Sequence, residues 1–180
     1  YQALVDVAKI KKGDKVLIHG ASGGVGHFAM QTAKHFGAYV IGTSSAKNRN
    51  FVLWLGADEH VDYTKENFAE KVQDADIVLD TIQGETLLHS VDAVRPDGII
   101  VTLPTPEIPQ EVIEKADMKQ VNIAFMMVAS KNETITAIAR LLEQEALKPH
   151  IHKTFPFEEI AKAHLEVETN RVVGKVVINI

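Results

Sequence analysis

A glycine-rich run near the beginning of the chain holds the residues whose types and spacing could do chemistry. Ala21, Gly23 and Gly26 fill the key positions of the spacing Gly-x-Gly-x-x-Gly, with alanine at the first position and Gly20 directly before it. Small residues let backbone N–H groups approach a phosphate closely, and a helix that begins there adds its dipole. We therefore predict a turn that binds the pyrophosphate of a dinucleotide, formed by Ala21, Ser22, Gly23, Gly24, Val25 and Gly26.

Polar and cationic residues follow the next predicted strand, where the adenosine ribose of a dinucleotide would lie. NAD sites usually place Asp or Glu at this point, but the first carboxylate after the strand is Asp58. Hydroxyls and cations suit a 2′-phosphate instead, through charge-assisted hydrogen bonds. NADP(H) is therefore the predicted cofactor, although a solvated turn with incidental basic residues would look the same. The segment supplies Thr43, Ser44, Lys47, Asn48 and Arg49.

The elements that must position these residues alternate between strand and helix. Strands are expected at Lys15–His19, Tyr39–Thr43, Glu59–Asp62, Asp76–Asp80, Ile99–Leu103 and Val121–Phe125. Helices are expected at Val25–Phe36, Lys47–Leu55, Glu66–Val72 and Gly84–Val91, and a turn at Pro96–Gly98. Apolar strands joined by helices predict an α/β fold with a doubly wound, six-stranded parallel sheet in the order 3-2-1-4-5-6. In that setting the glycine run favours phosphate binding over a loop that only eases packing.

The last third of the chain has a different pattern. Ser130 and Glu133 have the spacing of a capping box and predict a helix through Glu145. A strand, a helix and a strand are then expected at His150–Phe157, Glu158–Glu168 and Lys175–Ile180. We expect a Rossmann-type nucleotide-binding domain over residues 1–147 and a C-terminal strand-helix-strand appendage over residues 148–180.

Composition narrows the class of protein. The 180 residues carry a net charge of −5 with scattered basic residues, which argues against nucleic acid as a partner. No apolar run has membrane-spanning length and no signal peptide opens the chain, so a cytoplasmic protein is expected. The absence of cysteine excludes disulfides, thiolate nucleophiles and cysteine-bound zinc within this sequence.

No side chain has the setting of a catalytic acid, base or metal ligand. His150 and His152 could share a strand face, but no third ligand is near in sequence, so no metal is predicted. Asp80 is expected to accept hydrogen bonds at a strand end rather than act as a general base. Ser22 has no evident base and is assigned to the phosphate turn.

Several motifs, in this order along the chain, resemble those of one enzyme family. They are Gly13–His19, Ala21–Gly26, Leu55–Asp58, Val61–Tyr63, Asp76–Asp80, Pro96–Gly98 and Arg171–Val177. The chain resembles the quinone oxidoreductase-like, zinc-independent branch of the medium-chain dehydrogenase/reductase superfamily. Members carry a substrate domain before the nucleotide domain, joined to it by a helix that would include Tyr1–Leu4. The resemblance therefore implies a cofactor-binding fragment whose appendage, from His150 onward, normally docks on the other domain.

The resemblance also assigns residues to parts of the cofactor. Thr43, Ser44, Lys47 and Tyr63 would surround the adenosine ribose and its 2′-phosphate. Others would lie along the nicotinamide half and the outer edge: Thr102, Leu103 and Pro104 at the nicotinamide ribose, Phe125 to Met127 near the nicotinamide, and Lys175 at the edge. The implied activity is zinc-free hydride transfer from NADPH to a quinone or an α,β-unsaturated carbonyl, with the isolated chain binding cofactor only.

The sequence leaves two alternative functions open and also predicts a homodimer. A zinc-dependent alcohol dehydrogenase of the same superfamily, or a non-catalytic NADPH-binding redox sensor or structural protein, remain alternatives. The predicted sixth strand is an apolar sheet edge, and family members commonly pair this edge with a second copy, so we expect a homodimer through it. The appendage is expected to pair with itself, pack on the nucleotide domain or join a neighbouring molecule.

Overall fold

The predicted doubly wound sheet is present in the computed structural model, which describes residues 1–104 and 106–180. Six parallel strands are arranged in the order β3-β2-β1-β4-β5-β6. They are β1 (Lys15–Ile18), β2 (Tyr39–Ser44), β3 (Glu59–Asp62), β4 (Ala75–Asp80), β5 (Val94–Thr102) and β6 (Asn122–Phe125). The order reverses between β1 and β4, so a crevice is expected outside the carboxyl ends of these two strands.

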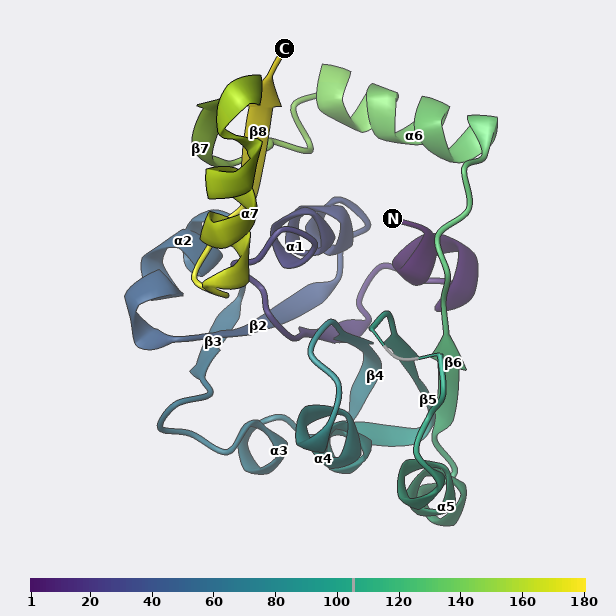
Figure 1. The fold of residues 1–180 in the computed structure, drawn as a ribbon. Helices are drawn as coiled ribbons and strands as arrows, with labels where there is room; N and C mark the ends of the chain where they lie inside the picture. The colour runs from purple at the N-terminus through teal and green to yellow at the C-terminus, as the bar shows by residue number, and fades with distance from the viewer. Residues whose placement is uncertain (105) are drawn as a thin grey trace.

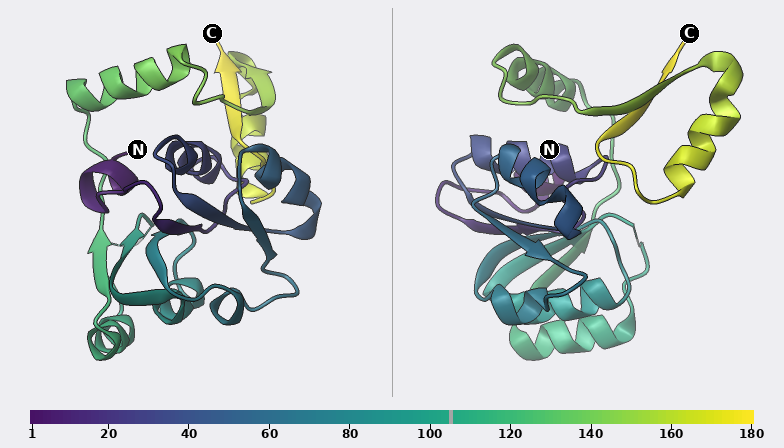
Figure 2. Two further views of the ribbon diagram at one scale, coloured as in Figure 1. Left: turned by 180° about the vertical axis from the view of Figure 1, so that it is seen from behind. Right: turned by 90° about the vertical axis from the view of Figure 1, so that its left-hand side faces the viewer.

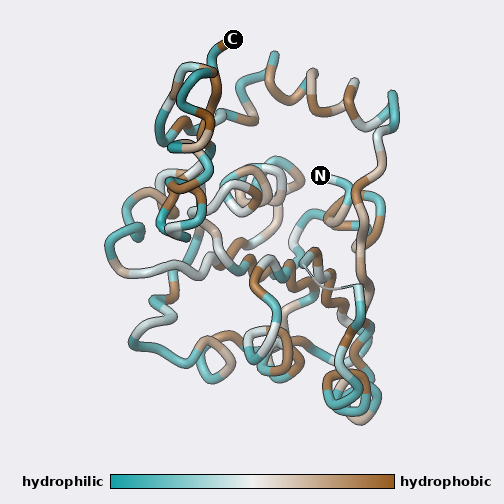
Figure 3. Tube along the Cα trace, viewed as in Figure 1, coloured by the Kyte–Doolittle hydropathy of each residue, from teal (hydrophilic) through white to brown (hydrophobic). Residues whose placement is uncertain are grey.

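Helices cover both faces of the sheet (Figures 1 and 2). One face carries η1 (Ala3–Val7), α1 (Gly26–His35), η2 (Ala46–Asn48) and α2 (Arg49–Trp54), and the other carries α3 (Phe68–Lys71), α4 (Glu85–Ala93) and α5 (Gln110–Lys119). Alternate strand residues supply the two cores, with Val16 and Ile18 buried on the α1 face and Leu17 on the α4 face. The tube in Figure 3 shows these strands as the hydrophobic centre of the molecule.

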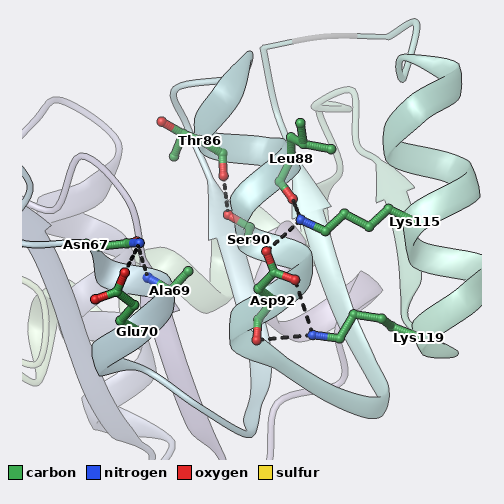
Figure 4. A network of polar contacts seen from close by, with 9 residues as sticks. All are labelled: Asn67, Ala69, Glu70, Thr86, Leu88, Ser90, Asp92, Lys115 and Lys119. Atoms are coloured by element: carbon green, nitrogen blue, oxygen red, sulfur yellow. Dashed lines mark hydrogen bonds and ion pairs between the residues drawn. The ribbon is translucent and has the colours of Figure 1, made fainter.

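Exposed ion pairs join two helices on the α4 face (Figure 4). Asp92 of α4 accepts from Lys115 at 2.6 Å and from Lys119 at 3.4 Å, both on α5. Ser90 donates to the Thr86 carbonyl at 2.6 Å within α4. The ion pairs are partly exposed, so they contribute little to stability. The burial of Leu87 and Val91 stabilises the packing of α4.

Helix α5 lies between two strands where the sequence analysis predicted no helix. Only Val112 and Ala116 are buried on it, so its sequence has a weak apolar period. It begins after Pro109 and ends at Gln120, whose φ of 58° is left-handed. The signal that could have revealed it is topological, because two adjacent parallel strands need a crossover connection.

The predicted turn at Pro96–Gly98 lies inside β5 instead of before it. Val94 pairs with Ala75 and Ile99 pairs with Ile77, so the intervening residues of β5 form a bulge. The turn-like character persists within this bulge, where Asp97 has a φ of 63°. The sequence thus identified the local bend but missed the strand that continues through it.

The capping box predicted for the next helix is wrong. Helix α6 (Asn132–Glu143) begins one residue later than the box requires, so Lys131 is the N-cap and makes no side-chain cap bond. Gln2 holds this end instead, since its amide donates to the Ala129 carbonyl at 2.8 Å and accepts from the Ala129 N–H at 3.1 Å. A tertiary contact from the start of the chain therefore replaces the expected local one.

The C-terminal appendage pairs with itself, as one of its predicted options required. Strands β7 (Ile151–Pro156) and β8 (Lys175–Asn179) form a separate two-stranded parallel sheet, connected through η3 (Phe157–Glu159) and α7 (Ile160–Glu168). Gln31 on α1 fixes the segment before β7 by bonding both the N–H and the carbonyl of Lys148, at 2.7 and 3.2 Å. Within the described ranges, no helix combines the length and apolar character needed to span a bilayer.

Candidate dinucleotide-binding site

The glycine turn connects β1 to α1 and is braced from inside the sheet. The Ala21 N–H donates to the Thr43 carbonyl at 2.9 Å, which extends the β1–β2 pairing by one step. The Gly23 N–H donates to the Gly20 carbonyl at 2.8 Å and closes the turn. Gly20 has a φ of 61°, which accounts for a glycine directly before the predicted motif.

Gly26 is the position of the turn where a side chain is least possible. A Cβ there would lie 2.1 Å from the Gly20 carbonyl oxygen and 2.7 Å from the Ala21 Cα. At Gly23 the nearest atom would be the same oxygen at 3.2 Å. Gly26 therefore allows the start of α1 to pack closely on the backbone of the turn at Gly20 and Ala21, while Gly23 leaves room for the Gly20 carbonyl.

The turn leaves backbone donors available. The N–H groups of Gly24 and Val25 donate to no other group within the described part of the chain. They lie just before the first residue of α1, where the helix dipole favours negative charge. Free donors at this place suit a phosphate, so the geometry fits the pyrophosphate role predicted from the sequence.

The two hydroxyls predicted near the adenosine ribose are buried and bonded within the protein. The Thr43 hydroxyl lies 3.1 Å from His19 Nδ1, and the Ser44 hydroxyl lies 2.8 Å from His60 Nε2. Both residues are at most 3% exposed. These hydrogen bonds therefore fix the end of β2 to His19 and His60 inside the protein.

The buried His19 has a defined tautomer because of its neighbours. The Ser90 hydroxyl donates its proton to the Thr86 carbonyl, so the Ser90 oxygen accepts a hydrogen bond from His19 Nε2 at 3.0 Å. Nδ1 then accepts from the Thr43 hydroxyl. Burial lowers the pKa of His19 to about 4, although Asp80 acts to raise it. His19 is therefore neutral and joins β1, β2 and α4.

The residues able to meet a 2′-phosphate lie on the outside of this loop. Lys47, Arg49 and Tyr63 are exposed, and Tyr63 has 62% of its surface accessible. The exposed cations and phenol are thus separated from the buried hydroxyls of the same predicted set.

Two buried residues of β3 near this loop escaped the sequence analysis. His60 Nδ1 and Asp62 Oδ2 are buried without a hydrogen-bond partner in the described residues. Hydrogen bonds from Thr64 lower the pKa of Asp62, and burial lowers the pKa of His60. The strand register, which pairs Ser44 with Asp62, brings this carboxylate to the end of β2, and sequence spacing alone does not show it.

The carboxyl ends of β4 and β5 are joined through Asp80, as predicted for a strand-end acceptor. Its carboxylate accepts from the Ile82 and Gln83 N–H groups, each at 3.0 Å, and from the Thr102 hydroxyl at 2.8 Å. Asp80 and Thr102 have no exposed surface. Thr102 therefore supports this end of the sheet with its side chain directed inward.

The next residues form the accessible part of this half. Leu103 is half-buried, Pro104 is exposed, and Phe125 and Met126 are half-buried on the adjacent strand end. The Met126 N–H donates to the Thr102 carbonyl at 3.1 Å, which holds the two strand ends side by side. The structure thus brings together the residues predicted for the nicotinamide half.

Lys175 comes from the other end of the chain to the glycine turn. The Gly174 N–H donates to the Ser22 carbonyl at 2.9 Å, and a Cβ on Gly24 would lie 3.4 Å from Lys175 Nζ. His27 is also fully buried here, donates from Nδ1 to the Gly23 carbonyl at 2.8 Å, and leaves Nε2 without a partner in the described residues. Burial lowers the pKa of His27, and Lys175 and His150 act in the same direction.

The two histidines considered for a metal have separate partners. His150 contacts the ring of Phe51 at a centroid distance of 4.6 Å, and His152 lies 3.4 Å from Glu166. In residues 1–104 and 106–180, no three His, Asp or Glu side chains are grouped so that they could hold a metal ion.

Comparison with known proteins assigns the chain to a family. Residues 55–178 match the family model described as zinc-binding dehydrogenase. The chain belongs to this family, within the medium-chain dehydrogenase/reductase superfamily. The superfamily resemblance inferred from the motifs is therefore confirmed.

Individual members of the family show how much of a whole protein the chain represents. It is 33% identical to the mouse mitochondrial NAD(P)H oxidoreductase RTN4IP1, covering 94% of this chain and 48% of that protein. It is 31% identical to a 2-haloacrylate reductase from a Burkholderia species, covering 94% and 56%. A quinone oxidoreductase structure from Coxiella burnetii superposes with a TM-score of 0.92 at 34% identity, covering 99% and 56%. The chain thus spans about half the length of the relatives that it matches.

Proposed function

We propose that this chain is the NADP(H)-binding domain of an oxidoreductase that transfers hydride to a quinone or an α,β-unsaturated carbonyl. The observation that carries the proposal is the turn at the start of α1. Its Gly24 and Val25 N–H groups donate to no group in residues 1–104 and 106–180, and the absence of a Cβ at Gly26 lets the helix begin against the backbone of Gly20 and Ala21. The bound cofactor would supply the hydride chemistry, and the chain would supply binding and orientation.

Each part of the site has a distinct role in this proposal. The free N–H groups of the turn bind the pyrophosphate, and Lys175 adds a positive charge beside it. Leu103, Pro104 and Phe125 form the surface that borders the nicotinamide ribose and ring. No residue of the chain is assigned as a catalytic acid or base.

Preference for NADPH over NADH rests on the exposed groups after β2 and β3. Thr43 and Ser44 are bonded to buried histidines, so they shape the loop. Lys47 and Tyr63 are then the side chains proposed to meet the 2′-phosphate, with Arg49 as an additional cation.

Calorimetric titration of the chain with NADPH and NADH tests the binding proposal. We expect NADPH to bind more tightly by about one to three kcal/mol, which one or two charged hydrogen bonds supply. Equal affinity for the two nucleotides would contradict the NADPH preference, and no binding of either would contradict the function itself.

Steady-state assays of the whole protein test the reaction. We expect oxidation of NADPH with quinones or enones that persists after treatment with a zinc chelator. Loss of activity on chelation and recovery with Zn²⁺ would favour the zinc-dependent alcohol dehydrogenase that the family name allows. Binding without turnover of any acceptor would favour a redox sensor or a structural protein.

We further propose that residues 1–147 form the nucleotide-binding domain and residues 148–180 a segment that packs on a substrate domain, and that the protein is cytoplasmic. A homodimer through β6 is part of the same proposal, because β6 is an outer strand of the sheet. Ile123 packs against the α4-face core, so replacing it would disturb the fold as well as the edge. Sedimentation of the unaltered protein at micromolar concentration is therefore the clean measurement, and a monomer would contradict the dimer.

A further inference from the structure

Ser22 is the point where three separate segments meet at the glycine turn. Its carbonyl accepts from the Gly174 N–H at 2.9 Å, and its hydroxyl oxygen accepts from the side-chain amide of Asn48 at 2.9 Å. Asn48 lies at the end of η2, in the loop proposed to face the 2′-phosphate. One side chain thus connects the two proposed phosphate-binding parts of the site.

The Asn48 side chain is available for this contact because it has no role in capping α2. Asn48 is the last residue of η2, which runs directly into α2, and its φ of −97° and ψ of 0° are not the extended values of a capping residue. Its side chain makes no cap bond in the part of the chain that the structure describes, and its amide donates to Ser22.

The contact determines what the Ser22 hydroxyl can do. A hydroxyl has one proton to donate, and within the described part of the chain the Ser22 proton has no acceptor. Because Asn48 approaches the oxygen as a donor, the hydroxyl proton is left for another group. Ser22 is only 8% exposed and is close in sequence to the N–H groups of Gly24 and Val25, which likewise have no acceptor in the described residues.

We propose that Asn48 is a positioning residue that holds the Ser22 hydroxyl as a hydrogen-bond donor to the pyrophosphate of the dinucleotide. This inference rests on the proposed function. It assigns neighbouring residues to different parts of the ligand, with Lys47 serving the 2′-phosphate and Asn48 serving the pyrophosphate through Ser22. Since NADPH and NADH share the pyrophosphate, Asn48 should matter equally for both.

Calorimetric titration with NADPH and with NADH tests this assignment on the parent chain and its variants. Asn48→Ala and Ser22→Ala should each weaken both nucleotides about tenfold, the effect of one hydrogen bond to a charged group. The double variant should also lose only about tenfold, because both changes remove the same interaction. Asn50→Ala is the matched control, since Asn50 is an exposed asparagine on the adjoining helix α2, and the affinity of this variant should stay within about twofold of that of the parent.

Asn48→Asp separates positioning from a structural role. Aspartate keeps the size and can still bond to Ser22, but only as an acceptor, so it draws the hydroxyl proton away from the ligand. We expect the melting temperature to remain near that of the parent while both nucleotides bind at least about thirtyfold more weakly, because the added charge also repels phosphate.

The outcomes distinguish this inference from the proposed function. Parent-like binding by Asn48→Ala or Asn48→Asp, additive losses in the double variant, or a loss confined to NADPH would overturn the role of Asn48 alone. A parent chain that binds neither nucleotide would overturn the proposed function and this inference with it.

Discussion

The two halves of the sheet end in different kinds of surface. At the β1–β3 half, buried polar side chains bond the strand ends together, and the accessible groups are cations and N–H groups that lack an acceptor in the described residues. At the β4–β6 half, one carboxylate, Asp80, fixes the strand ends, and the accessible residues above are apolar. Both halves have the same strand-helix topology, so the difference comes from side chains at the strand ends and from the first turn of each helix.

The contrast is clearest between the two glycines that precede or begin a helix. Gly26 begins α1 with the backbone of Gly20 and Ala21 pressed against it, whereas a Cβ on Gly84, which precedes α4, would meet no described atom within 4 Å. Glycine at position 84 is explained by its backbone, since φ is 61° and ψ is −137°. The turn after β1 is thus closely packed backbone, and the turn after β4 is not.

The largest expected effect tests this difference directly. Gly26→Ala should abolish nucleotide binding and lower the free energy of unfolding by about 3 kcal/mol or more, because the new Cβ meets rigid backbone. Gly84→Ala, the counterpart in the other half, should cost about 1–3 kcal/mol of backbone strain, because a φ of 61° with a ψ of −137° suits almost no residue but glycine, and it should leave binding intact. Urea denaturation and calorimetry measure both quantities. Equal effects of the two substitutions would remove the proposed distinction.

The buried histidine that joins the two halves should make stability depend on pH. The pKa of His19 is about 4 in the folded chain and about 6.5 when unfolded, so the unfolded state binds the extra proton between these values. The contribution of His19 is therefore fully present above pH 6.5 and is lost as the pH falls toward 4, by about 3 kcal/mol in total. His19→Gln should flatten the stability profile in this window, and the exposed His89→Gln should not. Parallel profiles for the parent and His19→Gln would contradict this role.

A smaller effect should appear at the outer loop of the β1–β3 half. Lys47→Ala should weaken NADPH about tenfold, the loss of about 1.4 kcal/mol from one charged hydrogen bond, and leave NADH nearly unchanged. Titration with both nucleotides measures the ratio. A similar loss for the two would mean that Lys47 does not meet the 2′-phosphate.

The smallest effect is expected on the outer surface of the other half. Asp92→Asn should remove the ion pairs to Lys115 and Lys119 and cost less than about 1 kcal/mol, decreasing as salt screens the pairs. Denaturation at low and high ionic strength measures it, with nucleotide affinity as the control. A salt-independent loss would indicate that Asp92 acts through packing.

The sequence predicted the elements with strong patterns and missed those fixed by distant contacts. Strands such as β1 and β4 are apolar and buried on both sides, so they could be recognised locally. Helix α5 buries only Val112 and Ala116, and the start of α6 is held by Gln2 from the other end of the chain, so neither had a sufficient local signal. The turn was recognised for a related reason, since the lack of a side chain at Gly26 is required by Gly20 and Ala21, which are only five or six residues away in the sequence.

The sequence by itself determined the six strands of the sheet, the glycine turn and the family resemblance, because these depend on residues near one another in the chain. Only the tertiary structure decided the direction of the polar side chains. The hydroxyls of Thr43 and Ser44 are hydrogen-bonded to buried histidines, and the amide of Asn48 donates to Ser22. The partners come from strands and helices that meet only when the sheet forms. A hydroxyl or amide bonds equally well to a ligand or to the protein, so its neighbours in the fold determine which it does.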